Sequence, residues 1–109
     1  MITVTFNCSD NLICGFTISG HSGFSEEGSD IVCAAVSSAA YMTANTITEI
    51  LHIDADVTEN DGFMNLSLSK GEAEKSAVVL DGLRLHLTAL SEQYTKYIKV
   101  KISEVLGNA

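Results

Sequence analysis

Hydrophobic and polar residues alternate in two stretches near the start of the chain, residues 2–8 and 12–18. This period of two is typical of β-strands with one buried face. A three-residue turn at 9–11 keeps the apolar sets of both strands on the same face, with Phe6 opposite Cys14, whereas a two-residue turn would separate them. We therefore predict an antiparallel hairpin with the longer turn.

The remaining pattern predicts two helices and three further strands. Residues 31–51 are rich in Ala with helical apolar spacing, and residues 72–95 carry leucines three and four positions apart. Residues 55–69 alternate around a turn at 60–62, and residues 98–102 alternate again. The order ββαββαβ indicates an α+β fold. We expect one domain of 109 residues, a two-layer sandwich with a mainly antiparallel five-stranded sheet and two long helices.

Composition and charge limit the classes of function. The formal net charge is −8, and none of the six Lys and Arg residues precedes Lys70. Proteins that bind nucleic acid directly usually carry a basic stripe, so we expect no direct contact with nucleic acid. The acidic front half either attracts a basic protein or only keeps the chain soluble.

Hydrophobicity bears on location and assembly. The hydrophobic content of 46% fits a surface partly buried against a second copy, which suggests a homodimer. We expect no membrane contact, because no apolar run approaches the roughly 18 residues of a membrane span. The start of the sequence lacks the features of a signal peptide, so we expect a cytoplasmic protein.

The candidate chemistry lies where the first hairpin ends and the first helix begins. His21 follows the second strand, and Cys33 falls in the first turn of the predicted helix, which Asp30 or Ser29 could cap. A thiol becomes a nucleophile when a base and a positive potential lie close to it, and a histidine and a helix N-terminus supply these. The spacing alone also occurs in inert proteins, so it leaves a structural role open.

Further groups near Cys33 extend this hypothesis. Backbone N–H groups at the head of the helix, that of Cys33 included, could stabilise an oxyanion. Ser37 follows one helical turn later on the same face, where it either bonds near the site or bonds its own backbone. A metal site needs three or four convergent ligands, whereas His21 and Cys33 supply two, so we expect no metal and no other cofactor.

The loop between the two candidate residues contains small and acidic residues. Such a loop is either a lid over a bound peptide or a plain connection. In the first case Gly20, Gly23 and Gly28 would act as its hinges.

The sequence around the candidate residues resembles the ribosomal-processing cysteine protease family, Prp, and the similarity extends over the whole chain. The resemblance is carried by Gly20-His21 and by Gly28-x-Asp30-Ile31-Val32-Cys33-Ala34-Ala35-Val36-Ser37. It implies a small cytoplasmic homodimer of a type found in Firmicutes. It also implies removal of a short N-terminal extension from a large-subunit ribosomal protein, the twenty-seventh in the standard naming, with cleavage after an aromatic pair.

By this resemblance His21 corresponds to the base and Cys33 to the nucleophile of a Cys-His dyad, while Asp30 and Ser37 match supporting positions. No third catalytic member emerges. The partner implied is the extended ribosomal protein precursor. A non-catalytic ribosome-assembly factor, which would hold its acidic face against a basic ribosomal protein, is the alternative.

Overall fold

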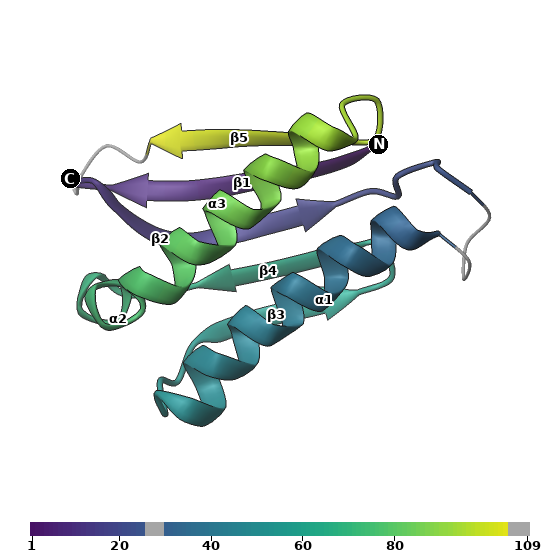
Figure 1. Ribbon diagram of the computed structural model, residues 1–109. Coiled ribbons are helices and arrows are strands. Elements are labelled where there is room, and N and C mark those ends of the chain that lie inside the picture. The colour runs from purple at the N-terminus through teal and green to yellow at the C-terminus, as the bar shows by residue number, and fades with distance from the viewer. Residues whose placement is uncertain (26–29, 105–109) are drawn as a thin grey trace.

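The computed structural model describes residues 1–25 and 30–104, and it places five strands in one sheet whose order is β3-β4-β2-β1-β5 (Figure 1). In chain order the elements are β1 (Ile2–Ser9), β2 (Leu12–Ser19), α1 (Ile31–Asn45), the π-helical turn η1 (Thr46–Ile50), β3 (Asp56–Asn60), β4 (Phe63–Ser67), α2 (Lys70–Lys75), α3 (Ala77–Gln93) and β5 (Ile98–Glu104). β1 and β5 run parallel, and the other neighbouring strands are antiparallel. The predicted α+β architecture with a mainly antiparallel sheet is confirmed.

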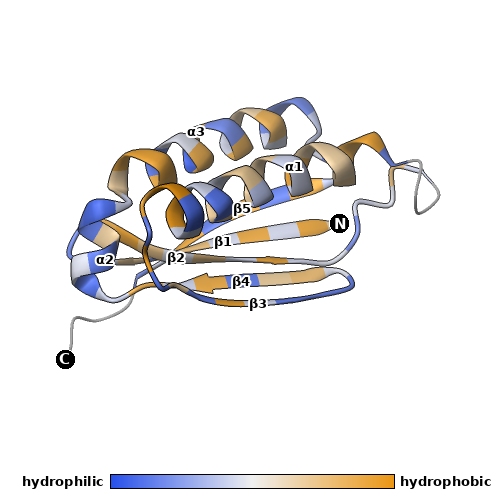
Figure 2. Cartoon of the chain, turned by 90° about the horizontal axis from the view of Figure 1, so that it is seen from below, coloured by the Kyte–Doolittle hydropathy of each residue, from blue (hydrophilic) through white to orange (hydrophobic). Residues whose placement is uncertain are grey.

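The core lies between the sheet and the two long helices. Figure 2 shows α1 and α3 side by side over one face of the sheet. Alternate strand residues and one face of each helix are buried there, among them Val4, Phe6, Phe16, Leu66, Val32, Val36, Leu80 and Leu87. Removal of this apolar surface from water supplies most of the stability of such a fold.

The predicted register of the first hairpin is wrong. Phe6 pairs with Phe16 instead of Cys14, and the turn contains two residues, Asp10 (φ 53°) and Asn11 (φ 66°). Asp and Asn accept this left-handed conformation more readily than other side chains. The register then shifts next to Asn7, so that Cys14 becomes the extra residue of a β-bulge. Because of the bulge, the apolar residues of β1 and β2 lie on the same face of the sheet. The prediction had attributed this arrangement to a longer turn.

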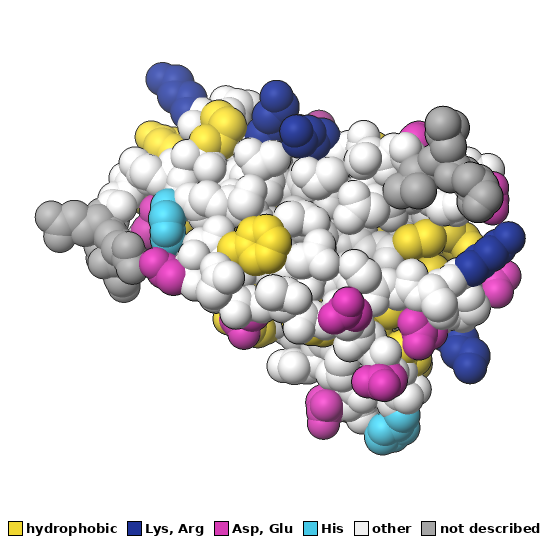
Figure 3. Space-filling view, turned by 180° about the vertical axis from the view of Figure 1, so that it is seen from behind, with side chains coloured by type: hydrophobic (Ala, Val, Ile, Leu, Met, Phe, Trp, Pro, Cys, Tyr) yellow, Lys and Arg dark blue, Asp and Glu magenta, His cyan; other side chains and the backbone are white. Residues whose placement is uncertain are grey.

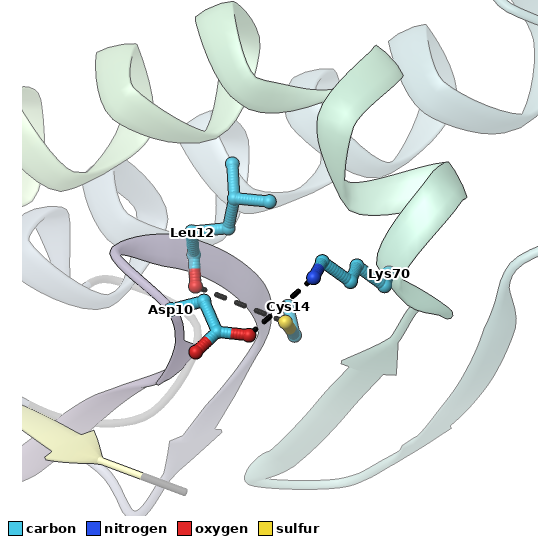
Figure 4. A network of polar contacts seen from close by, with 4 residues as sticks. All are labelled: Asp10, Leu12, Cys14 and Lys70. Carbon is cyan, nitrogen blue, oxygen red and sulfur yellow. Dashed lines mark hydrogen bonds and ion pairs between the residues drawn. The ribbon is translucent and has the colours of Figure 1, made fainter. Parts of the chain in front are cut away.

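The turn of this hairpin is linked to α2 by an exposed ion pair. Lys70 Nζ lies 3.5 Å from Asp10 Oδ2, and the bulged Cys14 donates its thiol to the Leu12 carbonyl at 3.8 Å (Figure 4). Both charged side chains are more than half exposed. Such a pair contributes at most about 1 kcal/mol.

The second predicted helix is divided into α2 and α3 by Ser76. Ser69 caps α2, because its hydroxyl accepts the Glu72 N–H while the Glu72 carboxylate accepts the Ser69 N–H. The helix therefore begins earlier than the predicted residue 72. The backbone N–H of Ser76 is shared among the carbonyls that end α2, and its side chain is buried. The first helix is continuous through η1 to Ile50, one residue short of the predicted end.

The opposite face of the sheet is polar. Figure 3 shows few hydrophobic side chains on this face, with Lys and Arg at its upper and right-hand edges and several Asp and Glu over its lower half. Thr17 and Asn65, on neighbouring strands, are joined there by a hydrogen bond of 2.7 Å. The polarity agrees with the one-sided burial that the alternating pattern predicted.

The segment Ile31–Ile50, which comprises α1 and η1, is long and apolar enough to cross a membrane, and it alone meets this criterion within residues 1–25 and 30–104. About 33% of its most apolar window is buried against the rest of the protein. A core helix meets the same criterion of length and composition, so the finding is weak evidence for a membrane span.

Candidate active site

A groove of about 850 Å³ lies between the first turns of α1, the end of β2 and the β3–β4 turn. It is bordered by His21, Cys33 and Ser37, so the fold brings these candidate residues to one place. Much of the remaining wall is apolar and includes Ile2, Ile18, Val36, Ala40, Tyr41, Phe63 and Met64. Glu59 and Asp61 also border the groove, whereas no Lys or Arg among the described residues does.

Asp30 fixes the start of α1 and with it the position of Cys33. Its backbone is extended, and its Oδ1 accepts the N–H groups of Val32 at 2.9 Å and Cys33 at 3.0 Å. Cys33 is therefore the third residue of the helix, and its side chain is half-buried. Because the Cys33 N–H is already donated to Asp30, the expectation that it would bind an oxyanion is not supported by this geometry.

Ser22, the residue after His21, is hydrogen-bonded to the head of helix α1. Its side chain is buried, its hydroxyl donates to Asp30 Oδ2, and the same hydroxyl accepts the Phe24 N–H at 3.0 Å. Its own backbone N–H donates to Cys33 Sγ at 3.4 Å. Sequence reasoning did not identify Ser22, because no local pattern shows that residue 22 will face residue 30.

The hydrogen bonds to Asp30 also set its ionisation. Burial raises the pKa of this carboxyl, but the bonds donated by the Ser22 hydroxyl and by the N–H groups of Cys33 and Val32 outweigh it and lower the pKa to about 2. The group therefore stays ionised at neutral pH. This agrees with a capping and positioning role for Asp30, because a carboxylate with so low a pKa is a weak base.

The low pKa of Asp30 predicts how stability depends on pH. Since the pKa lies below its ordinary value of 3.8, the charged carboxylate stabilises the fold above about pH 4, and this contribution is lost as the pH falls from about 4 to about 2. We expect the difference in unfolding free energy between wild type and Asp30→Asn to be constant near neutral pH and to shrink below about pH 4. Urea titrations at several pH values measure this difference in unfolding free energy. Asp81→Asn, at an exposed position of α3, is the control. A difference that does not change in acid contradicts the prediction.

His21 is positioned by the turn between β3 and β4. The N–H of Gly20 donates to the Gly62 carbonyl at 2.9 Å, and His21, which is exposed, follows at the end of β2. A Cβ at Gly62 would lie 2.9 Å from His21 Nε2, so this glycine leaves the space that the imidazole occupies. Within the part of the chain that the structure describes, no hydrogen bond joins His21 to Cys33.

Substitution of Gly62 is therefore expected to disturb His21. In Gly62→Ala the new methyl group meets the imidazole, and the φ of +71° costs an L-residue about 1 kcal/mol. The family resemblance implies that His21 is the base in peptide cleavage, and on that expectation kcat/KM should fall about 10- to 100-fold, because small displacements of a catalytic group have effects of this size. Gly71→Ala, where a Cβ meets nothing within 4 Å, is the control. Equal activity of the two variants would show that the turn does not position His21.

The loop after Ser22 packs against residues that directly follow α3. Phe24 makes edge contacts with Tyr94 and Tyr97, with ring centroids 6.0 and 5.2 Å apart. Gly20 and Gly23, two of the predicted hinges, have positive φ angles of 91° and 75°. Gly28, the third, lies outside the described residues, as does Ser29, the other candidate cap. The hinge function stays a prediction.

Comparisons with known proteins agree with one another. The family model described as cysteine protease Prp matches residues 1–99. The ribosomal processing cysteine protease Prp of Bacillus subtilis is 26% identical over 107 residues, which cover 92% of this chain and 96% of that protein. A structure from Streptococcus mutans has a TM-score of 0.79 at 28% identity and covers 96% of each chain.

Solved structures of the same fold include complexes with peptides. The essential ribosomal processing protease Prp of Staphylococcus aureus, in complex with a covalently linked product peptide, has a TM-score of 0.87 at 24% identity. The alignment covers 94% of this chain and all of that one.

Proposed function

Since this chain belongs to the cysteine protease Prp family and is a cysteine protease, we propose that Cys33 is its nucleophile and His21 its general base. The observation that carries the assignment is their place on one groove, with Cys33 on the first turn of α1. The other two cysteines fit less well. Cys8 is buried in the core and Cys14 lies in the bulge of β2, and neither borders the groove.

The proposed reaction is acyl transfer. His21 takes the proton of the Cys33 thiol, and the sulfur attacks the carbonyl carbon of the scissile peptide bond. The protonated imidazole then gives its proton to the leaving amine, and water hydrolyses the thioester that remains. In the resting protein the two groups border the groove without a mutual hydrogen bond, so substrate binding has to bring them together. Catalytic hydrogen bonds often form only at that stage.

Asp30 and Ser37 are proposed as supporting residues with different tasks. Asp30 holds the head of α1 in place through its contacts with the helix N–H groups and Ser22. Ser37 is exposed on the groove one turn after Cys33, where its hydroxyl can contact the substrate backbone.

The proposed substrate is the precursor of the large-subunit ribosomal protein, the twenty-seventh in the standard naming, which is cut after an aromatic pair. The apolar wall of the groove suits aromatic side chains, and its rim carries Glu59 and Asp61 without a neighbouring cation among the described lining residues. Such a rim favours encounter with a basic ribosomal protein. We also propose that the protein acts in the cytoplasm, where ribosomal proteins are made.

A homodimer is part of the proposal. α1 and η1 expose apolar side chains, including Tyr41, Met42 and Ile50 at 45%, 60% and 70% exposure, and Tyr41 also borders the groove. A second copy of the chain would cover them. Analytical ultracentrifugation at micromolar concentration measures this, and a mass of 11.6 kDa at all concentrations would contradict it.

The test of the proposed function is incubation of purified protein with the extended precursor. We expect wild type to release the short N-terminal peptide, identified by mass, with a single new N-terminus directly after the aromatic pair. An intact precursor that stays bound to the protein would instead support the assembly factor. A precursor in which the aromatic pair is replaced by two alanines is the control, and equal cleavage of both would contradict the proposed specificity.

A further inference from the structure

The backbone N–H of Ser22 points at the sulfur of Cys33. The distance from Ser22 N to Cys33 Sγ is 3.4 Å, and within residues 1–25 and 30–104 it is the only backbone donor to this sulfur. Three N–H groups at the head of α1 are engaged elsewhere, because Val32 and Cys33 donate to Asp30 Oδ1 and Ala34 donates to the Asp30 carbonyl. The Ser22 N–H, by contrast, is already directed at the sulfur next to which the oxyanion would form.

The side chain of Ser22 fixes the direction of this N–H. Only 3% of the residue is exposed. Its hydroxyl donates to Asp30 Oδ2 and accepts from the Phe24 N–H, so the residue is held on both sides. Asp30 is itself held by the helix that carries Cys33. The Ser22 hydroxyl and the Cys33 backbone N–H thus both donate to the Asp30 carboxylate, so the residue with the donor and the residue with the sulfur are held by one group. Electrostatic catalysis requires such preorganisation.

We propose that the backbone N–H of Ser22 stabilises the oxyanion of the reaction and that the Ser22 hydroxyl, through Asp30, is the positioning group that holds it there. The inference rests on the proposed role of Cys33 as nucleophile. It assigns to the loop after His21 a direct part in the chemistry.

The movement of charge explains why a donor near the sulfur suits this task. When a lone pair of the thiolate forms the S–C bond, the π electrons of the scissile C=O move to its oxygen, and the negative charge passes from sulfur to that neighbouring oxygen. The Ser22 N–H needs only a small change of direction to donate to this oxygen instead of the sulfur. The oxygen then re-forms the C=O bond, the C–N bond breaks, and the nitrogen takes the proton from the His21 imidazolium.

The first test is Ser22→Ala, which keeps the backbone N–H and removes the hydroxyl that holds it in place. We expect kcat for the precursor peptide to fall about 10- to 100-fold, somewhat less than when a whole oxyanion donor is lost, with KM changed less than about threefold because binding is largely unaffected. Ser38→Ala, at an exposed position of α1 outside the groove, should match wild type. Since Ser22 acts through Asp30, the losses in Ser22→Ala and Asp30→Asn should be far from additive in the double variant.

The second test uses a peptide aldehyde that ends at the cleavage point, since its adduct with a thiol places an oxygen where the oxyanion forms. The inhibition constant of the aldehyde should rise in Ser22→Ala by the same factor as kcat falls, while the dissociation constant of the matching peptide amide stays unchanged. In wild type, the NMR signal of the Ser22 amide proton should move downfield with the aldehyde and not with the amide. This last measurement needs no variant and so does not depend on how Ser22→Ala folds.

Two results would overturn the inference. One is an unchanged kcat in a folded Ser22→Ala variant, and the other is a Ser22 amide signal that responds equally to aldehyde and amide. Failure of the proposed function would look different, because wild type would then neither cleave the precursor nor form the aldehyde adduct.

Discussion

Cys33→Ala is expected to abolish cleavage of the precursor without loss of the fold. The thiol supplies the bond to the acyl group, so the variant should lose about 10⁴-fold or more in kcat. Its effect on stability should be about 1 kcal/mol, because the half-buried side chain loses one sulfur atom and its neighbours Val32 and Val36 keep their core contacts. Peptide cleavage and urea denaturation, measured on the same preparation, separate these two effects.

A matched control is available in the same chain. Cys14→Ala removes a thiol that is also half-buried but does not border the groove, and it should cleave the precursor at the wild-type rate. Mass spectrometry of rapidly quenched wild type and Cys14→Ala should show an acyl group on Cys33. Residual cleavage by Cys33→Ala, or a loss of equal size in Cys14→Ala, would contradict the assignment of the nucleophile.

Features with a local cause could be predicted from the sequence. The start of α1 depends on one capping side chain next to an apolar helical stretch, and the structure places that cap at Asp30. The β3–β4 hairpin depends on the turn Asp61-Gly62, and its positive φ at Gly62 lies within the predicted turn 60–62. The order of strands and helices followed from their periodicities in the same way.

The errors and omissions concern features that periodicity and local sequence patterns do not record. The bulge at Cys14 was missed because periodicity counts apolar residues and cannot detect one extra residue between two strands. The break at Ser76 lies inside the predicted helix 72–95, and the serine there is buried, which its residue type alone does not indicate. Ser22 and Gly62 acquire their importance only when Asp30 and His21 come beside them, and no pattern within either segment records that contact.

His21→Ala is expected to lower kcat by about 10²- to 10⁴-fold, the range that general acid–base catalysis contributes. The loss should depend on the leaving group. An amide nitrogen must be protonated before it leaves, whereas the phenolate of an activated ester leaves without a proton. We therefore expect a much smaller loss for the nitrophenyl ester of the same acyl peptide than for the peptide bond.

The comparison of ester and amide cleavage tests a role that the position of His21 in the structure does not show. Its Nε2 edge lies against Gly62, and within the described residues it makes no hydrogen bond to Cys33, so the imidazole must change position before it can accept the thiol proton. His86→Ala, at an exposed position of α3 that does not border the groove, controls for the loss of any imidazole. Equal losses for ester and amide in His21→Ala would contradict the role of this residue as the acid that protonates the leaving amine. The proton of the leaving group would then have to come from elsewhere, and His21 would keep only the role of base toward the Cys33 thiol. An unchanged kcat for both substrates would contradict the dyad itself.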